Sequence, residues 1–230
     1  VILTTHSPYF VNPLADHTTI VRLERASEDE KAPVNPCTYR SETIDFDENT
    51  KKRLQAIQRM DTDLAEIFFG SYPILVEGDT EHAAFLASVI EKDHELADSI
   101  TVVRARGKAL LVPLIRIMKH FHISFGIVHD TDTPFRSDGG GNGMWTENEK
   151  IRDRIETCRA EGLNVCHRVS IPDFERFLGG EALGKDKPLV TYQRISDDPG
   201  LQLKVQELLE SLRSVDSNDP FSREIMTSGK

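Results

Sequence analysis

Carboxylates at three points along the chain have the residue types and spacing of metal-dependent chemistry. The three motifs are Glu77-Gly-Asp-Thr-Glu81, Asp130-Thr-Asp132 and Asp173-Phe-Glu175. Like charges that are brought together repel and raise one another's pKa, and a divalent cation removes that conflict. Oxygen donors of this kind favour Mg²⁺ or Mn²⁺. If the motifs meet, they therefore predict a site where two metal ions could stabilise the attacking and leaving oxygens of phosphodiester cleavage.

Short apolar segments precede each motif and are the elements that must position it. Residues 73–76, 123–128 and 164–169 are expected to be buried strands that end at the three motifs, and 100–103 is a fourth. Helices are expected between them, over about 79–90, 107–118 and 147–160. Strands that alternate with helices at this spacing predict an α/β fold with a parallel sheet flanked by helices. Open parallel sheets place their sites at the carboxyl ends of strands, so all three motifs are expected at one edge.

The flanking regions predict the rest of the organisation. Residues 1–25 read as strand, turn and strand, and 26–48 as a polar connector that contains Pro33 and Pro36. A helix is expected over 49–69, and another, appended one over 201–213. We divide the chain into 1–25, a linker and helix at 26–70, the catalytic domain at 71–180, and a helical element at 181–230 that completes the site.

Composition limits the function classes. The 230 residues carry 38 acidic and 28 basic side chains, a net charge of −10. Bulk charge therefore argues against tight nucleic-acid binding by the fragment alone. No apolar stretch is long enough to span a membrane, and three cysteines without a CxxC pair indicate reduced thiols and a cytoplasmic location. The chain does not begin with Met, which suggests a fragment of a longer protein.

The motifs together resemble a known family. The segments Ile74–Glu81, Gly107-Lys108 and Ile127–Asp132 resemble the Toprim domain of topoisomerases, bacterial-type primases and OLD (overcoming lysogenization defect) nucleases, over about residues 73–178. The resemblance implies a Rossmann-like Toprim sheet and a metal-dependent DNA endonuclease or nickase. The implied cofactors are two divalent cations, Mg²⁺ or Mn²⁺, with Ca²⁺ as a non-catalytic substitute.

The first twelve residues resemble the last core strand and switch-histidine loop of an ABC-type ATPase, with His6 as the switch histidine. An ATPase that runs directly into a Toprim domain is the layout of OLD nucleases and of the Gabija anti-phage subunit. The resemblance implies DNA as substrate, an N-terminal ATPase domain in the same chain that alone binds ATP, a helicase partner, oligomer formation through the ATPase, and a role in phage defence or DNA repair.

The resemblance also implies residue roles. Glu77, Glu81, Asp130 and Asp132 would be catalytic metal-binding residues, with Asp173 and Glu175 as further ligands. Lys230 would stabilise the transition state, with Lys185 and Lys187 as competitors. Arg104, Arg106 and Lys108 would contact DNA phosphates at the same sheet edge.

Two other readings stay open. Another Toprim activity would need a topoisomerase tyrosine, for which Tyr9, Tyr39, Tyr72 and Tyr192 are available, or the zinc module of a primase, which three scattered cysteines cannot supply. A non-catalytic metal-binding regulatory module would bind cations without cutting DNA. Residues 179–185 mimic a phosphate-binding loop but lack the Ser or Thr after the lysine, so we reject that motif.

Overall fold

A four-stranded parallel sheet forms the centre of the protein, in a computed structural model that describes residues 1–25, 29, 31–40, 46–60, 63–69, 72–92, 94–180 and 185–213. Its strands are β3 (Tyr72–Val76), β4 (Ile100–Arg104), β5 (Phe125–Asp130) and β6 (Val165–Ser170), in the order β4-β3-β5-β6. All neighbouring pairs are parallel. The structure confirms the predicted α/β fold, and the strands lie within two residues of their expected positions.

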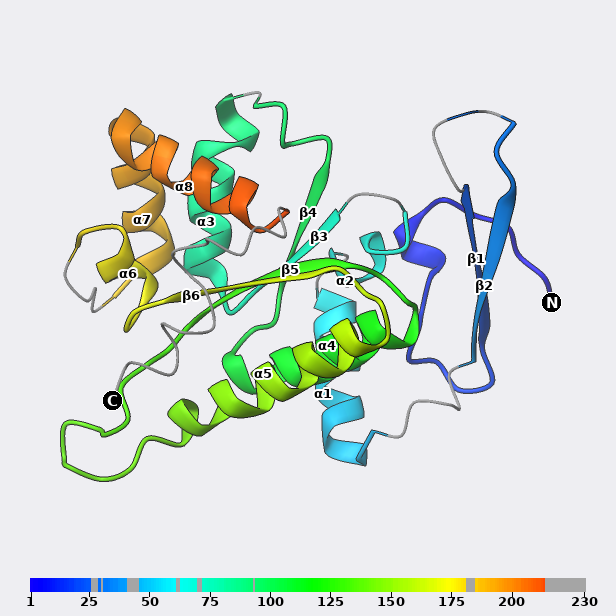
Figure 1. The fold of residues 1–230 in the computed structure, drawn as a ribbon, viewed down its shortest axis with the longest axis horizontal. Coiled ribbons are helices and arrows are strands. Elements are labelled where there is room, and N and C mark those ends of the chain that lie inside the picture. The colour runs from blue at the N-terminus through cyan, green and yellow to red at the C-terminus, as the bar shows by residue number, and fades with distance from the viewer. Residues whose placement is uncertain are drawn as a thin grey trace.

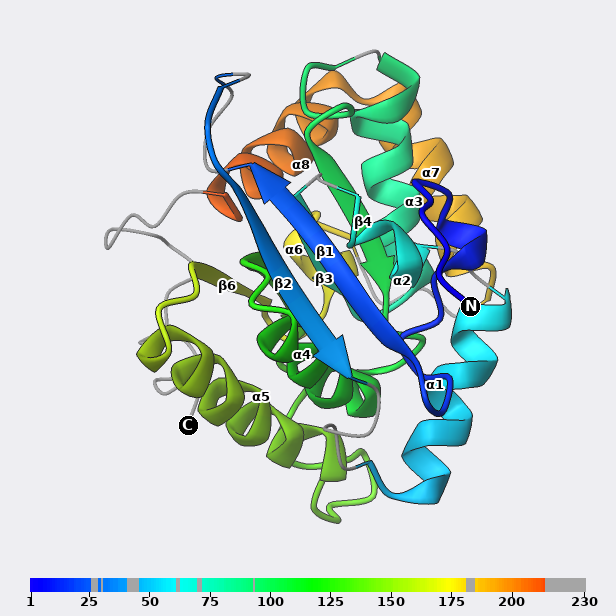
Figure 2. The same ribbon diagram turned by 90° about the vertical axis from the view of Figure 1, so that its right-hand side faces the viewer.

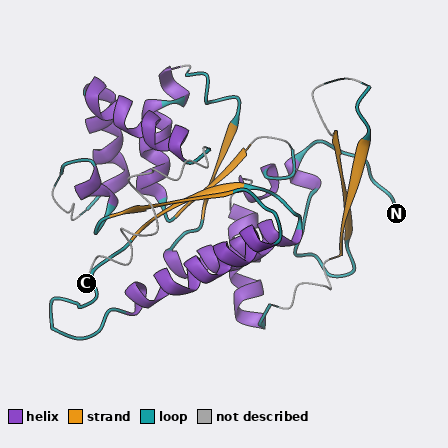
Figure 3. Cartoon of the chain, viewed as in Figure 1, coloured by secondary structure: helices purple, strands orange, loops and turns teal. Residues whose placement is uncertain are grey.

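Helices cover both faces of the sheet (Figure 1, Figure 3). On one face lie α4 (Leu111–His120) and α5 (Gly143–Ala160); on the other lie α3 (Asp79–Ser88), α7 (Lys187–Asp197) and α8 (Pro199–Ser211). The strands supply both layers because successive side chains point to opposite faces. Leu75 belongs to the α4–α5 core cluster, whereas Ile74 and Val76 belong to the cluster under α3, α7 and α8.

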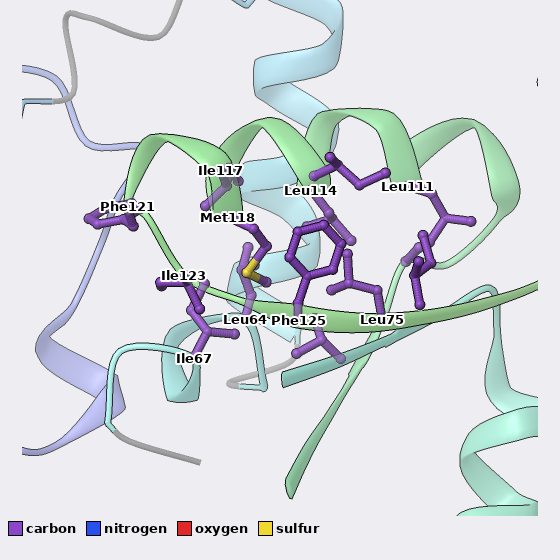
Figure 4. Close-up of a cluster of buried hydrophobic side chains, with 14 of the residues drawn as sticks. Leu64, Ile67, Leu75, Leu111, Leu114, Ile117, Met118, Phe121, Ile123 and Phe125 are labelled. Atoms are coloured by element: carbon purple, nitrogen blue, oxygen red, sulfur yellow. The ribbon is translucent and has the colours of Figure 1, made fainter. Parts of the chain in front are cut away.

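The larger core cluster is built around α4, whose apolar side chains face the sheet (Figure 4). Leu111, Leu114, Ile117 and Met118 are fully buried, as is Phe125 on β5. Each of these side chains stabilises the fold by roughly 1.5–3 kcal/mol when it leaves water. This packing fixes β5, and with it the strand end that carries Asp130. None of the described helices is both long and apolar enough to cross a membrane.

A separate antiparallel hairpin precedes the sheet, and the sequence did not predict its second strand. It pairs β1 (Thr19–Arg25) with β2 (Val34–Arg40), so the expected connector over 26–48 is wrong in its middle part. Pro36 misled the prediction, because proline lacks the ladder donor yet is tolerated in a two-stranded edge. Figure 2 shows the two long strands of this hairpin side by side. Tyr39 joins the hairpin to the core, since its ring stacks on Phe121 with the centroids 4.1 Å apart.

The N-terminal segment also differs from expectation. Residues 1–7 have no assigned strand or helix, so the strand expected at the start of the chain is wrong. The first element is instead a short 3₁₀ helix, η1 (Pro8–Phe10). Within the range 49–69, where one helix was expected, the structure describes α1 (Glu48–Met60) and α2 (Asp63–Glu66).

The last described helices are part of the sheet's core. Helix α8 lies where a helix was expected over 201–213, whereas α7 was not predicted. Val205, Leu208, Leu209 and Leu212 of this region are buried in the same cluster as Val128 of β5. The C-terminal helices therefore close one face of the Toprim-like sheet.

The close approach of α8 to β5 predicts that Gly126→Ala destabilises the protein. A Cβ at Gly126 would lie 2.8 Å from the carbonyl oxygen of Leu212, so the helix end must shift. Overpacking of this kind costs about 1–3 kcal/mol. Urea unfolding measures the loss, with Gly141→Ala as the control because its Cβ meets no atom within 4 Å. Equal stability of the two variants would contradict this packing.

Candidate active site

Acidic side chains from three strand ends meet at the carboxyl edge of the sheet. Glu77 directly follows β3, Asp130 is the last residue of β5, and Glu175 lies in α6 (Phe174–Phe177) just after β6. The backbone N–H of Asp130 donates a hydrogen bond to Oε2 of Glu77 at 3.4 Å. Parallel strands place these carboxyl ends together, as the sequence predicted.

Glu81 joins the same cluster from the first turn of α3. Its Oε2 accepts a hydrogen bond from the N–H of Gly78 at 3.2 Å, which satisfies one free backbone donor at the helix start. The Glu81 residue is only 4% exposed. The four-residue spacing from Glu77 therefore turns the second glutamate inward, as expected.

The carboxylates hold their protons unusually strongly. Burial, followed by the nearby charges of Glu81, Glu77, Glu175 and Asp132, raises the pKa of Asp130 to about 9. Burial is also the largest cause for Glu81, whose pKa rises to about 7. Burial raises the pKa of Glu77 as well, and Lys108 opposes that rise. Burial and mutual repulsion both disfavour the ionised carboxylates. A bound cation would favour the ionised forms and so reverse these shifts.

One carboxylate oxygen has no partner in the described structure. Oδ1 of Asp130 is buried and forms no hydrogen bond there. A buried acceptor without a donor is costly and suits a ligand that brings positive charge. The oxygen-donor set thus fits Mg²⁺ or Mn²⁺ in its chemistry, although no three donors among the described residues already converge in a metal-binding arrangement.

Asp132 contacts a lysine rather than another acid. Lys108 starts the 3₁₀ helix η4 (Lys108–Leu110), and its side chain is fully buried. Its Nζ donates to Oδ2 of Asp132 and to the backbone oxygen of Asp130, both at 2.6 Å. We expected Lys108 to contact DNA phosphate, but its ammonium faces the acidic cluster and is not presented at the surface.

The third motif is divided between two roles. Glu175 is buried, and its Oε1 lies 3.0 Å from Nζ of Lys187 at the start of α7. Asp173 instead caps α6, because its Oδ1 accepts from the N–H of Arg176 at 2.9 Å and its other oxygen pairs with that side chain. Glu175 therefore belongs to the cluster, whereas Asp173 is occupied by its own helix.

The basic residues that the sequence assigned to the site lie at its margin, on the surface, or outside the residues that the structure describes. Nη1 of Arg106 lies 2.7 Å from Oδ1 of Asp79, and Nη1 of Arg104 lies 3.5 Å from the same atom. Both arginines are partly exposed near the start of α3, where a phosphate could compete with Asp79. Lys185 is exposed. Lys230 lies outside the described residues.

A buried histidine pair behind the site was not predicted as a unit. Nε2 of His129 lies 2.9 Å from Nε2 of His167, and Nδ1 of His129 lies 2.8 Å from the backbone oxygen of Asp130. Burial lowers the pKa of His129 to about 3, so this ring is neutral. Since the carbonyl only accepts, His129 donates through Nδ1 and accepts from His167. The two histidines meet because β5 and β6 are neighbours in the sheet, with Ile127 opposite His167. This register cannot be read from the spacing of residues along the sequence.

Comparison with known proteins shows which family this chain is similar to. A family profile described as "Overcoming lysogenization defect protein-like, TOPRIM domain" matches residues 68–132, which contain Glu77, Glu81, Asp130 and Asp132. An OLD nuclease of Thermus scotoductus is 28% identical over 195 residues. That alignment covers 82% of this chain and 36% of the relative, so the chain spans about a third of the relative's length.

The raised pKa values predict that the metal-free protein loses stability as the pH increases. A carboxyl whose folded pKa is raised stabilises the fold fully below its unfolded pKa, and this contribution falls as the pH rises through the folded pKa. For Asp130 the loss extends from about pH 4 to about pH 9. Asp130→Asn should flatten this slope in urea unfolding with a chelator present. Parallel profiles for the variant and the wild type would contradict the burial of an unpaired acid.

Proposed function

We propose that this chain, whose residues 68–132 match an OLD-like Toprim family profile, is the nuclease part of a metal-dependent enzyme that cuts or nicks DNA. The observation that carries the proposal is the cluster of carboxylates at the sheet edge, in which Glu81 and Glu175 are buried and Glu77 and Asp130 are half-buried. The buried Oδ1 of Asp130 has no hydrogen-bond partner in the described structure. Mutually repelling acids that are held together away from water are costly to the fold, and groups with pKa values perturbed in this way cluster at functional sites. The similarity to a nuclease supplies the reaction class.

The proposed ligands are the acids that the edge brings together. Two divalent cations, Mg²⁺ or Mn²⁺, would supply an activated water and stabilise the leaving oxygen. Glu77, Glu81, Asp130 and Glu175 would hold them, because their carboxylates interact electrostatically within one cluster. Asp173, which caps α6, is the least available member of the set predicted from sequence.

The chain's other residues would orient the substrate. Arg104 and Arg106 lie beside the start of α3 and would exchange Asp79 for a DNA phosphate. Lys108 cannot do so without leaving its buried site. For the transition-state lysine we retain Lys230, with Lys187 as the alternative because it already contacts Glu175.

A tyrosine nucleophile of the topoisomerase kind fits this structure less well. Tyr39 is buried in the core, where burial raises the pKa of its phenol to about 12. The hydroxyl of Tyr72 is also buried, and that of Tyr192 hydrogen-bonds Glu91. Only Tyr9 among the four is highly exposed, on η1.

The wider setting follows from the family resemblance. We propose an ATP-binding domain N-terminal to this region in the same chain, a cytoplasmic location, oligomer formation through that domain, and a helicase partner in phage defence or DNA repair. Because the chain has a net charge of −10, the ATP-binding domain and the helicase partner would supply much of the affinity for DNA.

Asp130→Ala is expected to lower cleavage of supercoiled plasmid by roughly 100-fold or more, because a central ligand of the ions is lost. The measurement compares nicked and linear products in Mn²⁺ or Mg²⁺ with those of the wild type. Asp153→Ala is the matched control, since Asp153 is an exposed residue of α5. Undiminished cutting by Asp130→Ala would contradict the proposal, and cation binding without cutting by the wild type would favour a regulatory module.

The late lysines can be separated by kinetics. Lys230→Met is expected to lower kcat about 100-fold with little change in KM, because a charge that acts only on the transition state is lost. Lys187→Met should reduce kcat only a few-fold, through weaker positioning of Glu175. Lys150→Met, at an exposed lysine of α5, serves as the control. A large kcat loss confined to Lys187→Met would transfer the catalytic role to Lys187.

A further inference from the structure

The most unusual cation in the described structure is the ammonium of Lys108. It is fully buried, although a lysine pays a high desolvation cost unless it is paired. Both groups that it contacts belong to the Asp130-Thr-Asp132 motif. The proposed metal site therefore already contains one positive charge of its own.

Backbone contacts hold Lys108 in this position. Gly107, which precedes it, has a φ of +122°, a conformation that other residues rarely adopt. The N–H of Gly107 donates to the carbonyl oxygen of Glu77 at 2.9 Å. The turn thereby ties the start of η4 to the end of β3 and directs the lysine stem under the acidic edge.

The backbone of Asp132 is also fixed. This residue adopts φ +60° and donates its N–H to the carbonyl oxygen of Pro172 at 2.8 Å. With the backbone held on one side and the carboxylate held by Lys108 on the other, Asp132 has little freedom to turn toward the other acids. The ammonium contacts the backbone oxygen of Asp130 and leaves its carboxylate available.

We propose that Lys108 is a resident cation of the site that neutralises Asp132 and keeps it out of the metal coordination shell. This inference rests on the proposed metal site and changes its ligand set. Divalent ions would be held by Glu77, Glu81, Asp130 and Glu175, while the Lys108–Asp132 pair positions the Asp130 backbone. Lys108 and Asp132 are thus positioning residues, and the charge of Lys108 limits how strongly the site attracts further cations.

A double-mutant cycle tests this pair through Mn²⁺ binding, measured by calorimetry on the whole chain. Lys108→Met should tighten binding about tenfold, since it removes a positive charge and frees a carboxylate. Asp132→Asn should weaken binding by a similar factor, because it leaves an unpaired ammonium beside the ions. The double variant should return to within about threefold of the wild type, since a neutral pair has been replaced by a neutral pair.

A second readout separates positioning from direct coordination. The number of waters on bound Mn²⁺, measured by water-proton relaxation, should be the same in the wild type and in Asp132→Asn. An added water in that variant would show that Asp132 is a ligand and would overturn the inference. So would a Lys108→Met variant that binds Mn²⁺ no more tightly than the wild type.

The control is an ion pair elsewhere in the fold. Lys119 and Glu161 approach within 2.8 Å, partly exposed at the far ends of α4 and α5. The same cycle with Lys119→Met and Glu161→Gln should leave Mn²⁺ binding unchanged. These binding results do not depend on cleavage, so they can fail while the nuclease proposal stands; if the wild type binds no Mn²⁺, the proposed function and this inference fail together.

Discussion

Repulsion between carboxylates that are partly or fully removed from water is the constraint on which the site depends. Burial and the neighbouring acids together raise the pKa of Asp130 to about 9. A cluster of this kind is stable only when protons or cations offset the charge. Lys108 supplies one such charge at Asp132, and Lys187 supplies another at Glu175. Neither lysine pairs with the carboxylate of Asp130. We therefore expect the proposed divalent ions to lie beside that carboxylate.

Core packing fixes the strand ends independently of the acids, and its free energy offsets the repulsion among them. Cores on both faces of the sheet determine where β3 and β5 end. The acids are then carried on these rigid ends and on the first turns of α3 and α6, so they cannot relax away from one another without disrupting the packing. Helix α8 contributes to this rigidity through its contact with Gly126.

The sequence predicted those parts of the structure that a local pattern encodes. Runs of buried apolar residues identified all four strands, and the rule that parallel strands present their sites at one edge brought Glu77 and Asp130 together correctly. The strand β2 was missed because Pro36 is also typical of a loop. The residue type of Lys108 does not show whether its ammonium faces solvent or a carboxylate. That distinction depends on a turn at Gly107 and on contacts between residues more than twenty positions apart.

The most direct test of the account is a crystal of the protein soaked in Mn²⁺, with the ions located by anomalous scattering. The account predicts one ion between Glu77 and Asp130, a second near Glu81, and a Lys108–Asp132 pair that remains intact. Ions bound elsewhere, or none at the sheet edge, would contradict the claim that these buried acids form a cation site.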